Sequence, residues 1–143
     1  MDAFDADVLI YAISPSGPHG PALRSALAET AATTPDGKIG VGSVLLITET
    51  LIKPVRGGDD REAGEMARLL DRLELFGCDL ATAELAVDLG ARYGLKAVDA
   101  VHLATAITAD ADRFITNNRR DFSKAIEEID ITYPEDLVAG SAG

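Results

Sequence analysis

The chain has 143 residues, a length that suits one domain with a proper hydrophobic core. Its 47% hydrophobic content excludes an intrinsically disordered protein, and its single cysteine excludes an intramolecular disulfide and a cysteine-based zinc cluster. The formal net charge of −11 at pH 7 excludes attraction of nucleic acid by the overall field, so contact with phosphates would need a local basic patch or a bound metal.

Apolar runs and turn residues alternate along the chain, which predicts short strands and helices. Residues 8–13 are apolar throughout and are ambiguous between strand and buried helix. The other expected elements are, in chain order, strand 1–4, loop 14–21, helix 22–32, strand 39–41, helix 44–53, helix 60–75, strand 76–80, helix 82–93, helix 97–109, strand 113–116, helix 122–128 and strand 129–132.

Capping residues support several of these boundaries. Ser43 suits the start of a helix that Pro54 would stop, and Asp59 opens a sequence that resembles a capping box. Thr82 is expected to cap the next helix, and Gly94 to end it as a C′ glycine.

Strands separated by helices are typical of a parallel sheet covered on both faces. We therefore predict an α/β fold, a three-layer α/β/α domain with a central, mostly parallel sheet over residues 1–137. Residues 138–143 are expected to form a flexible C-terminal tail. The start of the chain shows no secretory signal, and the run at 8–13 is too short to cross a bilayer, so we expect a soluble, cytoplasmic protein without membrane contact.

Four acidic residues lie within or beside apolar segments: Asp5, Glu49, Asp99 and Asp121. Burying a carboxylate without a partner is energetically costly. Carboxylates gathered at one place also repel one another, and a bound cation is the usual remedy. A divalent-metal site is therefore the first hypothesis.

The positions of these acids suit a ligand site, because ligands of parallel α/β sheets collect at the carboxyl ends of the strands. Asp5 ends the first predicted strand, and residues 117–121 follow the fourth. Other interpretations stay open: Asp5 and Asp121 could cap helices, and Asp99 could satisfy a helix dipole. Asp7 is open between a metal contact, an N-cap and a group that supports a ligand.

Four segments resemble, in order, the motifs of PIN domains: residues 4–11 with Asp5, 43–49 ending at Glu49, 94–106 around Asp99, and 112–122 with Thr116 and Asn117. Together they cover nearly the whole chain. The length and the last two motifs are similar to the VapC-type toxins of bacterial and archaeal toxin–antitoxin pairs. The resemblance implies that residues 8–13 are helical. It also shows one departure, because Asn118 stands where the family commonly has an aspartate.

Such relatives are metal-dependent endoribonucleases, so the resemblance implies cleavage of RNA phosphodiester bonds with Mg²⁺ or Mn²⁺. Clustered carboxylates prefer these hard cations to zinc. Asp5 and Asp99 would be direct metal ligands, and Glu49 would be a direct or water-mediated one. Asp121 would orient water or a second ion.

Other residues have supporting roles in this interpretation. Thr116 and Asn117 are candidates to hold a phosphate, Asn118 offers a neutral oxygen to a metal or its water, and His102 is assigned to packing. The candidates for contact with RNA phosphates, each of which could equally be solvated surface, are Arg119, Arg120, Lys124, Lys53 and Arg56.

The resemblance also implies a cognate antitoxin that inserts a segment beside the carboxylates, often with a basic residue, and a homodimeric toxin. Two alternatives remain. The tetrapeptide at residues 5–8 matches the nucleophile motif of haloacid-dehalogenase phosphatases, in which Asp5 would be phosphorylated and Asp7 would act as acid or base, although the lysine and later acidic pair of that family have no convincing equivalents. A PIN-like binding or scaffold protein with a weakened site is the non-enzymatic alternative, motivated by Asn118.

Overall fold

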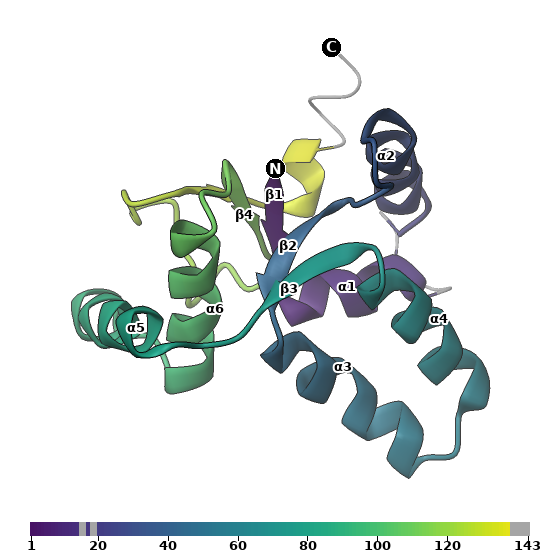
Figure 1. Ribbon diagram of the computed structural model, residues 1–143, viewed down its shortest axis with the longest axis horizontal. Helices are drawn as coiled ribbons and strands as arrows, with labels where there is room; N and C mark the ends of the chain where they lie inside the picture. The colour runs from purple at the N-terminus through teal and green to yellow at the C-terminus, as the bar shows by residue number, and fades with distance from the viewer. Residues whose placement is uncertain (15–16, 18–19, 138–143) are drawn as a thin grey trace.

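The computed structural model describes residues 1–14, 17 and 20–137, and its centre is a five-stranded sheet in the order β3-β2-β1-β4-β5 (Figure 1). All neighbouring strands in it are parallel. The strands are β1 Asp2–Phe4, β2 Gly40–Ser43, β3 Leu73–Phe76, β4 Arg113–Ile115 and β5 Asp130–Thr132. The predicted tail at 138–143 and half of the predicted loop at 14–21 lie outside the described residues.

Helices cover both faces of this sheet, which confirms the predicted three-layer α/β/α architecture. Helices α1 to α4 pack on one face, and α5 and α6 on the other (Figure 1). The helices are α1 Ala6–Ile13, α2 Gly20–Thr33, α3 Leu45–Arg56, α4 Asp60–Leu70, α5 Leu80–Tyr93 and α6 Ala97–Thr108. None of the described helices combines the length and apolarity that a membrane span requires.

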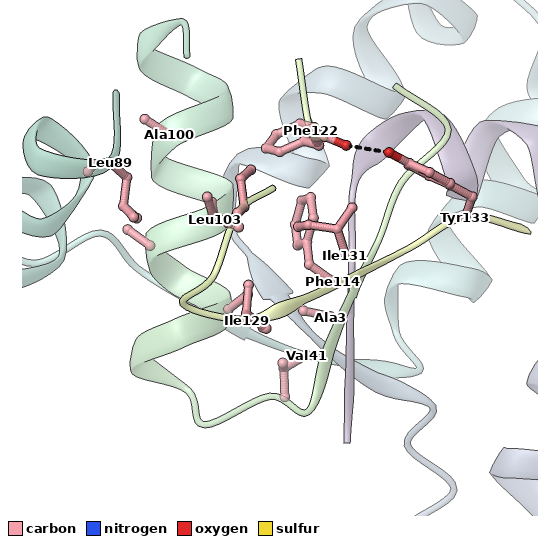
Figure 2. Packing of buried hydrophobic residues seen from close by; sticks show 14 residues of the cluster. Ala3, Val41, Leu89, Ala100, Leu103, Phe114, Phe122, Ile129, Ile131 and Tyr133 are labelled. Atoms are coloured by element: carbon pink, nitrogen blue, oxygen red, sulfur yellow. Dashed lines mark hydrogen bonds between the residues drawn. The ribbon is translucent and has the colours of Figure 1, made fainter. Parts of the chain in front are cut away.

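The two hydrophobic clusters follow from the two-residue period of the strands. In β1, Ala3 belongs to the cluster under α5 and α6, whereas its neighbour Phe4 belongs to the cluster under α1 to α4. In β4, Phe114 and Ile115 divide in the same way. Figure 2 shows the first cluster, in which Phe114 lies among residues of α6, β5 and the loop after β4.

Two predicted boundaries differ from the structure around residues 70–80. The helix α4 ends at Leu70 instead of continuing to about 75, and the strand occupies Leu73–Phe76 instead of 76–80. The physical reason is tertiary pairing: residues of β3 bond along β2, with Gly40 in register with Leu73. This pairing overrides the local helical preference of the segment.

The predicted helix at 122–128 is also wrong, because these residues form turns. Phe122 is anchored instead by its ring against Phe114, at 4.9 Å between centroids, and by the Tyr133 hydroxyl, which donates to the Phe122 carbonyl at 2.9 Å (Figure 2). Ile126 is buried as well. Tertiary contacts therefore hold this segment without helical hydrogen bonds.

The caps agree with the sequence in part. Asp59 accepts a bond from the Glu62 amide at 3.0 Å, and Gly94 ends α5 with a φ of 68°. Asp79, not Thr82, caps α5, because its carboxylate accepts from the Thr82 amide at 2.8 Å. The helix α3 runs through Pro54 to Arg56, because a proline in the last turn removes one helical hydrogen bond without forcing an end.

Candidate metal centre

Asp5 is the most buried acid of the site, with 5% of its surface exposed. It ends β1 and caps α1, and its Oδ1 accepts from the Ala6 amide at 2.9 Å. Its Oδ2 accepts from the Thr116 hydroxyl at 2.8 Å. Burial nevertheless raises the pKa of Asp5 above its ordinary value, against the lowering effect of the Thr116 hydrogen bond and His102. The cap that the sequence offered as an alternative is real, but it engages only one carboxylate oxygen.

Asp7 lies in the first turn of α1 and reaches the segment after β4. Its Oδ1 accepts from the Asn117 amide at 3.1 Å. Burial, followed by the negative charge of Asp5, raises the pKa of Asp7 to about 6. Asp7 therefore links the start of α1 to the segment after β4 and adds a carboxylate to the site.

Asp99 brings the buried helix α6 to the same site. Its pKa is raised first by burial and then by the negative charges of Asp5, Asp121 and Glu49. Carboxylates that shift one another's pKa lie within electrostatic reach, although their residues span more than half of the chain. Asp5, Glu49 and Asp121 are thus the acids whose charges act on Asp99, and a metal ion shared by the four stays a prediction.

Glu49 is the most solvent-exposed of the four acids of the site. Its side chain is 35% exposed, and its Oε1 contacts Nε2 of His102, whose side chain is 1% exposed. The apolar segment around Glu49 is only partly buried: Leu46 is fully buried, whereas Ile47 and Ile52 are 42% and 54% exposed. The sequence interpretation missed the His102 contact, although its position one helical turn after Asp99 was the available signal.

The segment after β4 carries a closed network of hydrogen bonds. The Thr116 hydroxyl accepts from the Asn118 amide at 3.0 Å while it donates to Asp5. The Asn118 side-chain amide donates to Asp121 at 3.0 Å, and the Asp121 amide donates back to the Asn118 side chain at 3.2 Å. Asp121 caps no helix, because residues 122–129, which follow it directly, are not helical.

Two of the five basic candidates are engaged elsewhere. Arg119 pairs with Glu135 and lies over the Tyr133 ring at 4.6 Å from its centroid, and Lys124 pairs with Asp136 at 2.8 Å. Within the part of the chain that the structure describes, the three that make no side-chain ion pair are Arg120, Lys53 and Arg56, all exposed.

The donor chemistry fits a hard divalent cation. The donors are carboxylate, amide and hydroxyl oxygens, and among the described residues no lysine or arginine forms an ion pair with Asp5 or Asp99. Among the described residues, no three His, Cys, Asp or Glu side chains already stand in a ligating arrangement. An ion would therefore have to draw the carboxylates a short distance together, with charge neutralisation as the driving force.

A second feature lies at the far end of α1 from Asp5. A cavity of about 580 Å³ is bounded by α1, α2 and α4, with an apolar floor that includes Ala12, Leu27 and Ile39. Four of the chain's 13 basic residues line it: Arg24, Arg61, Arg68 and Arg72. This arginine-lined cavity is a basic region on an acidic protein.

Comparisons with known proteins match residues 3–128 to the PIN domain. One similar solved structure is a toxin–antitoxin complex from Klebsiella pneumoniae, with 24% identity, a TM-score of 0.71 and coverage of 94% of this chain and 98% of that chain. Another is VapBC2 from Rickettsia felis bound to a DNA fragment from its promoter, with 17% identity, a TM-score of 0.72 and coverage of 92% and 97%. At these identities the structures establish the shared fold. No curated protein sequence matches the chain.

Proposed function

The chain belongs to the PIN domain family, and on that premise we propose that it is a metal-dependent endoribonuclease, the toxin of a VapBC-type pair. The observation that carries the proposal is the mutual electrostatic influence of Asp5, Glu49, Asp99 and Asp121, four acids from the end of β1, from α3, from α6 and from the segment after β4. No described lysine or arginine forms an ion pair with Asp5 or Asp99, which favours a bound cation as their partner. The two similar complexes, whose titles name a toxin–antitoxin complex and VapBC2, support the biological role.

Asp5, Asp99 and Glu49 would hold Mg²⁺ or Mn²⁺. Such an ion lowers the pKa of a bound water and stabilises negative charge on phosphoryl oxygens. Asp5 is the fixed member of the set, because the Ala6 amide and the Thr116 hydroxyl orient its carboxylate. Glu49 approaches from the solvent side, where a substrate would enter.

The loop after β4 would position water and phosphate. Asp121 keeps a carboxylate near Asp99, and Asn118 holds that carboxylate by its side-chain amide. Thr116 and Asn117 supply a hydroxyl and a backbone amide that already orient Asp5 and Asp7. The phosphatase alternative gains less support, because a nucleophilic Asp5 would be buried and hydrogen-bonded at both oxygens.

The five basic residues proposed to contact RNA fall into two groups, those free of ion pairs among the described residues and those already paired. Lys53 and Arg56 follow Glu49 by one and two turns of α3, and Arg120 is exposed beside Asp121, so these three are the better candidates for phosphate contact. Arg119 and Lys124 would first have to leave Glu135 and Asp136. Cellular RNA as substrate places the proposed activity in the cytoplasm.

We further propose that the antitoxin contacts two regions of this chain. A basic residue of the antitoxin would lie against the carboxylates, and a segment with both aliphatic and acidic side chains would fill the arginine-lined cavity, where Arg68 and Arg72 have no ion-pair partner among the described residues. The expected partner is the product of a short reading frame beside this gene.

The toxin would be a homodimer that uses α3. This helix exposes Ile47, Ile52 and Val55, with Val44 just before it, at spacings that place them on one side of a helix. Exposed apolar patches of this kind mark interaction sites.

The main experiment measures Mn²⁺ binding by calorimetry and RNA cleavage for the wild type, Asp5→Asn, Asp99→Asn and the control Asp88→Asn on the exposed side of α5. We expect the two site variants to lose cleavage by at least about a hundredfold and to bind Mn²⁺ weakly, because each removes one charge from the donor set. The control should match the wild type.

Two outcomes would reject catalysis at this site: a wild type that binds no Mn²⁺, or site variants that cut RNA as well as the wild type. Mn²⁺ binding without RNA cleavage by the wild type would favour the scaffold alternative instead.

A further inference from the structure

His102 is buried on α6, and its ring makes one polar contact with the part of the chain that the structure describes. Its Nε2 meets Oε1 of Glu49, which lies on α3 on the other side of the site. An ionised carboxylate only accepts hydrogen bonds, so Nε2 carries the hydrogen and donates it. The contact joins a rigid side chain to an exposed, flexible one.

The other ring nitrogen argues against a role in packing alone. Nδ1 of His102 is buried and has no hydrogen-bond partner among the described residues. A buried polar atom without a partner destabilises the fold, and a leucine of similar volume would avoid that penalty. The ring therefore keeps one polar atom unsatisfied while the other serves Glu49.

The geometry of α6 places this contact at the proposed metal centre. His102 follows Asp99 by one helical turn, so both side chains lie on the same side of α6. Glu49 is among the groups that raise the pKa of Asp99 and of Asp5. The Glu49 carboxylate that contacts His102 is therefore the solvent-exposed member of the acidic group formed with Asp5 and Asp99.

We propose that His102 is a positioning residue that fixes the carboxylate of Glu49 for metal binding by donating from Nε2. This inference rests on the proposed function, because it gives Glu49 its place in the donor set. Without His102, Glu49 would keep its charge but would sample several side-chain conformations, most of them turned to solvent. Hydrogen-bonded partners of ligating side chains are commonly worth 10- to 100-fold in metal affinity.

The first test compares Mn²⁺ affinity by calorimetry in His102→Leu, His102→Gln and Glu49→Gln. Leucine fills the space without a donor, whereas the glutamine amide can donate from about the position of Nε2. We expect His102→Leu to weaken Mn²⁺ binding about 10- to 100-fold and His102→Gln to restore it to within a few-fold of the wild type. In the Glu49→Gln background, His102→Leu should cause little further loss.

A packing role predicts a different pattern. His102→Leu would then leave Mn²⁺ affinity unchanged, or His102→Leu and Glu49→Gln would weaken it independently, with no rescue by glutamine. Either result would overturn the inference while leaving the proposed nuclease function intact if the wild type binds Mn²⁺ and cuts RNA.

The second test needs no substitution at His102 and no metal. Nitrogen NMR of the imidazole in the metal-free protein should show hydrogen on Nε2 and a bare Nδ1, with an Nε2 hydrogen that exchanges slowly with water. Glu49→Ala should make that exchange faster. A ring with hydrogen on Nδ1 and none on Nε2, or one that does not respond to Glu49→Ala, would refute the positioning role even if the wild type proved to bind no Mn²⁺.

Discussion

At the scale of single residues, Asp7 shows how the site opposes the stability of the metal-free fold. Burial and Asp5 raise its pKa from an ordinary 3.8 to about 6. As pH rises from about 4, the unfolded chain releases this proton before the folded one does, so the free energy of unfolding falls. The loss is complete once the pH exceeds the folded pKa of about 6.

Asp7→Asn should therefore stabilise the metal-free protein near neutral pH. The asparagine oxygen can still accept from the Asn117 amide, and the charge is gone. We expect a gain of about 1–2 kcal/mol at pH 7.5 after allowance for partial exposure, shrinking as the pH falls toward 4.5. Urea unfolding in EDTA at several pH values measures it. A gain that does not depend on pH, or that Asp88→Asn reproduces, would contradict this explanation.

The resemblance to PIN motifs suggests an aspartate at position 118, and Asn118→Asp tests what the asparagine does there. The aspartate loses the donor that holds Asp121 and adds a negative charge to an acidic cluster. Without metal we expect a loss of about 1 kcal/mol in stability, and with metal a several-fold gain in Mn²⁺ affinity. Unfolding and calorimetry on the same samples measure both. Weaker Mn²⁺ binding would show that Asn118 is better suited to this site than the usual acid.

At the scale of elements, β1 positions the site because it ends at Asp5, and its neighbour β2 approaches it closely. A Cβ at Gly40 would lie 2.4 Å from the Asp2 carbonyl oxygen and 2.5 Å from the Phe4 ring. Both obstacles lie in β1, so the two strands would have to separate.

Gly40→Ala should destabilise the protein by about 3 kcal/mol, because a buried backbone atom cannot move aside cheaply. The matched control is Gly77→Ala, where an added Cβ meets nothing within 4 Å, and it should change stability by less than about 0.5 kcal/mol. Thermal or urea unfolding of the two variants decides. Equal effects would mean that β1 and β2 tolerate separation and do not fix Asp5.

Elements also show where sequence reading fails. The sequence pattern predicts helix through residues 73–75 and strand only from Phe76, because residues 73–75 suit a helix locally and only pairing with β2 makes them a strand. The segment after Asp121 was assigned a helix, because its buried Phe122 and Ile126 mimic helical spacing. Caps that depend on neighbouring residues, such as Asp59, were predictable.

At the scale of the whole molecule, the exposed apolar side of α3 predicts self-association. Val55 is 66% exposed and should lie at the interface, whereas Val87 on α5 is exposed to a similar degree and should not. We expect a wild-type dimer, at least a tenfold weaker dimer for Val55→Glu, and no change for Val87→Glu, because a buried unpaired charge opposes association. Sedimentation equilibrium measures the constants. A monomeric wild type, or equal effects of the two variants, would refute a dimer through α3.

The sequence alone determined the fold class, the order of the four acidic positions and the placement of Asp5 and Asp121 after strands, because hydrophobic periodicity and strand-end geometry are local properties. Only the tertiary structure decided that Arg119 and Lys124 are engaged with Glu135 and Asp136, and that His102 contacts Glu49. These pairings join residues from separate elements, and the strength of a charge or hydrogen bond depends on distance and burial. Neither quantity exists until the sheet has brought the elements together.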